Sequence, residues 1–98
     1  MLIQIATVEE LKDALEKVQK GYAEACAAQD EADKRYTAIG FELGKMKKAH
    51  KSEKAMKPLR DDLEDAYAAV KRLNKERMAA YRVLRDTQNA LDAAERAA

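Results

Sequence analysis

Ninety-eight residues, 38% of them charged and only 5% aromatic, are enough for one domain with a thin apolar core. This composition excludes a large enclosed active-site cavity, and three glycines with one proline leave few places for turns. No apolar run approaches the about 18 residues of a membrane span, and the N-terminus lacks a signal-peptide pattern. We therefore expect a cytoplasmic protein that does not contact a membrane.

The first half of the chain predicts an apolar N-terminal arm, residues 1–6, and a helix over residues 7–48. We expect the arm to pack on the helices or on a partner chain. The helix begins with a capping box at Thr7 and Glu10, in which the Thr7 hydroxyl accepts from the Glu10 amide. Core positions then recur at an average spacing of about 3.5 residues, which is typical of a coiled-coil seam. They are Val8, Leu11, Leu15, Val18, Tyr22, Ala25, Gln29, Ala32, Tyr36, Ile39, Leu43 and Met46.

The second half repeats this pattern after a basic connection over residues 49–56. Pro58 is the only proline, and because proline is tolerated in the first turn of a helix but not in its interior, it predicts a helix over residues 57–97. The seam positions of this half are Met56, Leu59, Leu63, Ala66, Val70, Leu73, Arg77, Ala80, Leu84, Thr87, Leu91 and Ala94.

Two helices of equal length joined by a short connection predict an all-α fold, a long antiparallel hairpin resembling a coiled coil. Two registers are compatible with the seam. One pairs Tyr22 with Ala80 and Tyr36 with Ala66, whereas the other places Tyr36 on Leu73. We favour the first, tighter register because its large side chains meet small ones.

Apolar residues also flank the seam, and a stripe wider than the seam needs more than one neighbour to cover it. We therefore expect two hairpins to pair into a four-helix bundle, as a homodimer. The candidate dimer-interface residues are Cys26, Tyr67, Tyr81 and Val83. Gln29 and Arg77 are polar positions within the seam, where they specify register or mark the entry of water or a partner.

Charge is concentrated near the centre of the sequence. Residues 45–60 carry seven basic side chains and one acidic side chain, a net charge of +6, whereas the remaining residues have a net charge of −5. A hairpin would gather these charges at its tip, where they would attract an acidic protein surface or phosphates. The candidate partner-binding residues are Phe41, Lys45, Lys47, Lys48, His50, Lys51, Lys54, Lys57 and Arg60.

Residue patterns for catalysis or cofactor binding are not found. His50 is the only histidine, and the spaced aspartates Asp30 and Asp33 lack the Glu-x-x-His pattern of bundle metal sites. We therefore expect no enzyme activity, no metal and no cofactor. The favoured hypothesis is a protein-binding adaptor or inhibitor that docks on a larger complex with an acidic surface. The alternatives are a nucleic-acid binder that uses the basic tip as an electrostatic clamp and, more weakly, a structural dimerisation module.

Overall fold

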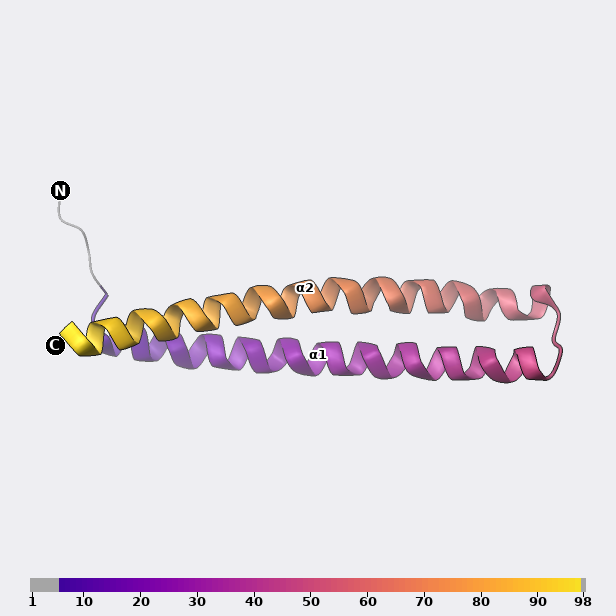
Figure 1. Ribbon diagram of the computed structural model, residues 1–98, viewed down its shortest axis with the longest axis horizontal. Helices are drawn as coiled ribbons and strands as arrows, with labels where there is room; N and C mark the ends of the chain where they lie inside the picture. Colours follow the sequence, from indigo (N-terminus) through magenta and orange to yellow (C-terminus); the bar gives the residue numbers. More distant parts are fainter. Residues whose placement is uncertain (1–5, 98) are drawn as a thin grey trace.

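The chain forms two long antiparallel helices joined by a short turn (Figure 1). The computed structural model describes residues 6–97, in which α1 spans Val8–Lys48 and α2 spans Glu53–Ala97. The molecule is a rod measuring 69 × 24 × 14 Å, with the turn at one end and the start of α1 beside the end of α2 at the other (Figure 1). This confirms the predicted all-α hairpin. Apart from Ala6, which is exposed, the expected N-terminal arm lies outside the described residues.

The start of α1 agrees with the predicted capping box. The Glu10 amide donates to Oγ1 of Thr7 at 3.1 Å, which satisfies one of the amide groups that the first helical turn leaves without a backbone partner. The Thr7 hydroxyl in turn donates to Oε1 of Glu10, also at 3.1 Å. Glu9 and Glu10 lie in this first turn, where their negative charges favour the positive end of the helix dipole.

The end of α1 is closed by a Schellman motif, although no glycine is present to form it. The Lys51 amide donates to the carbonyl of Met46 at 3.0 Å, and the His50 amide donates to the carbonyl of Lys47 at 3.1 Å. This arrangement places His50 at a φ of 54°, in the left-handed region that glycine usually occupies at this position. His50 therefore has a defined backbone role in the turn, which its sequence context did not indicate.

The predicted start of α2 was wrong by four residues. The helix begins at Glu53, because Ser52 caps it: Oγ of Ser52 accepts from the Ala55 amide at 3.2 Å. Pro58 consequently lies inside the helix, beyond the first turn, where it has no amide to donate to the carbonyl of Lys54. The prediction placed Pro58 in the first turn of the helix and overlooked Ser52 as a cap.

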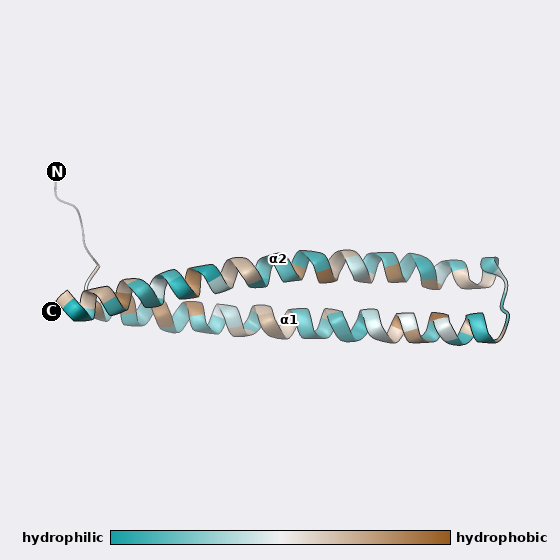
Figure 2. Ribbon diagram, in the orientation of Figure 1, coloured by the Kyte–Doolittle hydropathy of each residue, from teal (hydrophilic) through white to brown (hydrophobic). Residues whose placement is uncertain are grey.

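The core of the hairpin is a single seam, and it is thin. Only Leu43, Met56, Ala66 and Leu91 are buried among the described hydrophobic residues. The other predicted seam positions are half-buried, except Tyr36, which is 37% exposed. Hydrophobic and hydrophilic segments accordingly alternate along both helices (Figure 2). Most seam side chains thus keep one side in contact with solvent.

Two tyrosine pairs establish the register. The rings of Tyr22 and Tyr81 have centroids 5.8 Å apart, and those of Tyr36 and Tyr67 are 5.7 Å apart. Each α2 tyrosine directly follows the alanine that the tight register places opposite the α1 tyrosine. The tight register is therefore confirmed, and the small side chain of each alanine leaves room for the two rings to meet.

Candidate interaction surfaces

The basic tip, which we define as the basic residues from Lys45 to Arg60, lies at the closed end of the rod. Three of its cations have acidic partners: Lys45 bonds with Glu42 at 3.2 Å, Lys57 with Asp61 at 3.0 Å, and Arg60 with Glu53 at 3.1 Å. All three pairs are exposed, so each contributes at most about 1 kcal/mol to stability. These partners compensate only part of the positive charge.

Four lysines of the basic tip carry the rest of that charge. Among residues 6–97, no carboxylate lies within 4.0 Å of the ammonium groups of Lys47, Lys48, Lys51 and Lys54. The turn brings these four side chains together, because Lys47 and Lys48 end α1 while Lys51 and Lys54 lie in the turn and the first turn of α2. His50 is exposed in the same turn. This end of the rod therefore presents uncompensated positive charge to solvent.

Phe41 lies near the basic tip, on the outward side of α1. It is 67% exposed, and Nζ of Lys45 lies 4.8 Å from the centroid of its ring. Asp33, Lys34, Thr37 and Ala38 line a shallow depression beside it. Of the predicted partner-binding residues, Phe41 is thus the one apolar member, and it lies along the side of the rod and not at its end.

The four predicted dimer-interface residues divide between two sides of the hairpin. Successive residues of an α-helix are rotated by about 100°, so Val83 and Tyr81 project in nearly opposite directions around α2. Tyr67 and Tyr81 lie on one flank of the seam, and Cys26 occupies the equivalent position of α1 on that flank. Val83 lies on the other flank. One flat interface therefore cannot contain all four residues.

The flank that carries Val83 is formed by small residues and is hereafter called the small-residue flank. Toward the end of the rod opposite the turn, its members at matching positions of the two helices are Ala14, Gly21, Ala28, Val83 and Ala90. From the middle of the rod to the turn, the same positions include the charged residues Arg35, Glu42, Asp62 and Glu76. A hollow of about 300 Å³ lies on this flank, lined by Val18, Gly21, Tyr22, Ala80 and Val83 together with Lys17. Val83 is 51% exposed. Side chains this short allow another helix to approach closely.

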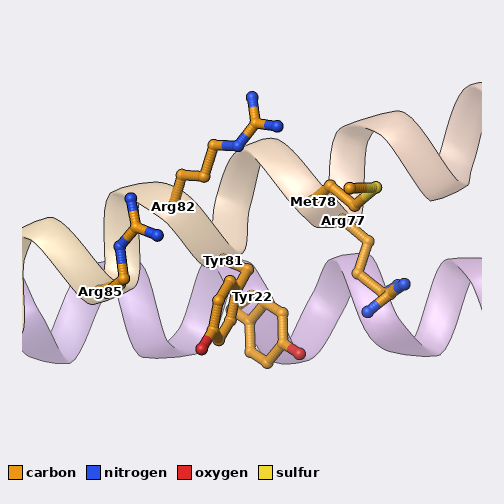
Figure 3. Close-up of a pocket in the computed structure, with 6 residues that line it drawn as sticks. All are labelled: Tyr22, Arg77, Met78, Tyr81, Arg82 and Arg85. Atoms are coloured by element: carbon orange, nitrogen blue, oxygen red, sulfur yellow. The ribbon is translucent and has the colours of Figure 1, made fainter.

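The opposite flank is hereafter called the tyrosine flank. It comprises the exposed α2 residues on the side of Tyr67 and Tyr81. The rings of Tyr22 and Tyr36, which pack against Tyr81 and Tyr67, also belong to it. A hollow of about 340 Å³ lies here, lined by Tyr22, Arg77, Met78, Tyr81, Arg82 and Arg85. Figure 3 shows that the guanidinium groups of Arg82 and Arg85 point away from α1, whereas that of Arg77 extends toward it. The three arginines therefore do not converge on one ligand.

A polar layer crosses the seam midway between the two tyrosine pairs. Nε of Arg77 donates to Oε1 of Gln29, and Nη2 of Arg77 donates to Oδ1 of Asn74 at 3.0 Å. Gln29 completes the triangle by donating from Nε2 to the same Asn74 oxygen at 3.2 Å. Gln29 and Arg77 were predicted as polar seam positions, but Asn74 was missed because it lies beside the seam. Three mutually bonded polar groups favour a structural role for this layer over a catalytic one.

The hairpin alone leaves far more surface in contact with water than a globular chain of its size. It exposes 7683 Å², whereas a globular monomer of 11.0 kDa exposes about 5,600 Å². The excess of about 2,000 Å² exceeds the roughly 800 Å² per partner that a standard protein interface buries. The surface is therefore large enough for a second copy and a further partner at the same time.

Comparison with known protein families, with curated proteins and with solved structures finds no match to this chain. Within residues 6–97, no three His, Cys, Asp or Glu side chains are arranged to hold a metal ion. Over the same residues, neither helix has an apolar stretch long enough to cross a bilayer.

Proposed function

We propose that this chain is a non-catalytic adaptor or inhibitor module that docks on an acidic surface of a larger protein through its basic tip. The observation that carries the proposal is the gathering of Lys47, Lys48, Lys51 and Lys54 at one end of the rod, with no carboxylate of the described chain within 4.0 Å of them. Complementary charge steers association and suppresses wrong partners. A positively charged end on a long rod reaches a site on a partner while the remainder of the rod stays clear of it.

The form that docks is a homodimer in which two hairpins make a four-helix bundle. The small-residue flank is the side that pairs, because its hollow is lined mainly by apolar residues and Gly21 lets a facing helix approach closely. Pairing through this flank covers Val83 and the half-exposed Val18 and Ala80. It leaves the basic tip of each copy accessible.

Charge reversal tests the docking surface. The variant Lys47→Glu/Lys48→Glu/Lys51→Glu/Lys54→Glu is compared with Lys12→Glu/Lys20→Glu/Lys34→Glu/Arg96→Glu, which changes the net charge equally but away from the basic tip. Tagged wild-type protein is used to capture partners from a nuclease-treated extract of the source cells. We expect one protein to be retained by the wild type and by the control, and lost by the tip variant. Equal retention by both variants would contradict the proposal.

Nucleic acid is the alternative ligand for the same lysines, and a second measurement distinguishes it. Fluorescence anisotropy with labelled single-stranded DNA, duplex DNA and RNA is recorded at two salt concentrations. The protein-docking proposal predicts no binding at physiological salt. Binding that falls steeply with salt and disappears in the tip variant would instead establish an electrostatic clamp for phosphates.

A further inference from the structure

The tyrosine flank of α2 has a charge pattern that the hairpin does not use. Between Glu64 and Asp92, the α2 positions on the side of the tyrosines hold Lys71 and Arg85, the adjoining outward positions hold Lys75 and Arg82, and neither set holds a carboxylate. The carboxylates within that stretch, Asp65, Glu76 and Asp86, lie at positions that turn away from the flank. Asp86 nevertheless reaches Arg85 at 3.4 Å, in an exposed pair. The α2 side of the flank is therefore a basic stripe that is separate from the basic tip.

Apolar anchoring points accompany these charges. Tyr67 and Tyr81 are 47% and 49% exposed, and they lie fourteen residues apart, about 21 Å along the helix. Met78 is half-exposed between them, beside the hollow that Tyr22 and Tyr81 line. Fourteen residues are two heptads, so a helix lying along α2 would present side chains of its own seam at this same spacing.

The aromatic rings are arranged unfavourably for stacking on nucleic-acid bases. Nζ of Lys71 lies 4.5 Å from the centroid of the Tyr67 ring, and the Tyr36 ring packs 5.7 Å from it. Tyr81 already packs against Tyr22. A stacking platform needs open ring faces near successive bases, and these rings are occupied and far apart. The flank suits a protein helix better.

We propose that the tyrosine flank is a second docking surface, which binds an acidic amphipathic helix of a protein partner. The apolar residues of that helix pack on Tyr67, Met78 and Tyr81, and its carboxylates meet Lys71, Arg82 and Arg85. Asp30 and Asp33 lie on the α1 side of the same flank, so they direct the acidic side of the bound helix toward α2. The inference rests on the proposed function in treating the chain as a protein-binding module, but it uses a different surface.

Two synthetic peptides test this proposal. Each has 28 residues, with leucine or isoleucine at the seam positions of four heptads; one carries glutamate at the flanking positions and the other carries lysine. Binding of each fluorescent peptide to the full chain is followed by anisotropy. We expect the acidic peptide to bind at least tenfold more tightly than the basic one. No difference between the peptides, or no binding of the acidic one, would overturn the proposal.

Variants then locate the binding site. Arg82→Glu/Arg85→Glu should weaken binding of the acidic peptide at least tenfold, whereas Lys20→Glu/Lys34→Glu, an equal charge change on the outward side of α1, should change it less than threefold. The methyl NMR signal of Met78 should shift on binding while that of the buried Met56 stays in place. If the four-lysine tip variant loses the peptide and the arginine variant keeps it, the second surface is refuted while docking through the basic tip stands. Both arginines are exposed, and circular dichroism verifies that the variants remain folded.

Discussion

Three glycines inside α1 give the sharpest test of whether the hairpin packs as described. Gly21, Gly40 and Gly44 all have helical backbone with negative φ, and a Cβ atom built on any of them has no atom within 4 Å apart from its chain neighbours and the adjacent helix backbone. Nothing in the hairpin therefore requires glycine at these positions. Each glycine costs the helix about 1 kcal/mol relative to alanine.

Replacing each glycine by alanine should accordingly raise the free energy of unfolding by about 1 kcal/mol. Gly21 and Gly40 lie about 28 Å apart along the helix, so their effects should add. For a domain of this size, 1 kcal/mol corresponds to a rise of about 4–8 °C in Tm. Urea and thermal unfolding followed by circular dichroism at low micromolar concentration measures both quantities.

The dependence of stability on protein concentration should distinguish the Gly21 variant from the Gly40 and Gly44 variants. Gly21 lies on the small-residue flank, where we place the second copy, so its added methyl group should weaken pairing at high concentration while it stabilises the helix at low concentration. Gly40→Ala should show the same gain at both concentrations. A loss of stability in Gly40→Ala or Gly44→Ala at low concentration would refute the packing described for α1.

Three further predictions concern the seam, the turn and the small-residue flank. Arg77→Ala should lower the free energy of unfolding by about 1–2 kcal/mol, because it leaves Gln29 and Asn74 without their shared donor. An unchanged midpoint of urea unfolding would contradict this prediction. His50→Gly should raise stability by about 0.5–1 kcal/mol, since glycine adopts a φ of 54° without strain, and an equal or lower Tm would argue against the Schellman turn. Val83→Glu should convert the proposed dimer to a monomer in sedimentation equilibrium, and a mass equal to that of the wild type would contradict pairing through the small-residue flank.

The helical hairpin and its register could be predicted because both follow from residue spacing and side-chain volume. The seam repeats without a break through both halves, and only the tight register places Tyr22 and Tyr36 opposite alanines. Tyr81 and Tyr67, the residues that follow those alanines, then fill the space beside them. The spacing of the seam residues and the volumes of their side chains can both be read directly from the sequence.

Three features were missed, each for a different physical reason. The start of α2 depends on the hydrogen bond from the Ala55 amide to Ser52, and Ser-Glu at residues 52–53 was a signal for it that the emphasis on Pro58 obscured. Asn74 lies outside the seam, so its bonds to Gln29 and Arg77 become evident only when the register is applied to the neighbouring positions. The left-handed backbone of His50 had no sequence signal, because glycine is the residue expected there.

The sequence predicted that apolar residues flank the seam. It was not predicted that these residues lie on two opposite sides of the hairpin. Tyr81 and Val83 are both apolar neighbours of the seam, but the helical rotation between them places them on opposite sides of the rod. Angular position around the helix therefore matters as much as apolar character. The consequence is two surfaces with different chemistry, one formed by small residues and one by tyrosines and cations.

The most direct test of docking through the basic tip is site-specific photo-crosslinking. A benzophenone amino acid is placed at Ala55, beside the turn, or at Ala93, near the opposite end of α2; both positions are exposed, helical alanines. The account predicts that Ala55 gives one crosslinked protein that resists nuclease and disappears in the four-lysine tip variant, and that Ala93 does not give it. Crosslinking of the same protein from Ala93 but not from Ala55 would contradict docking through the basic tip.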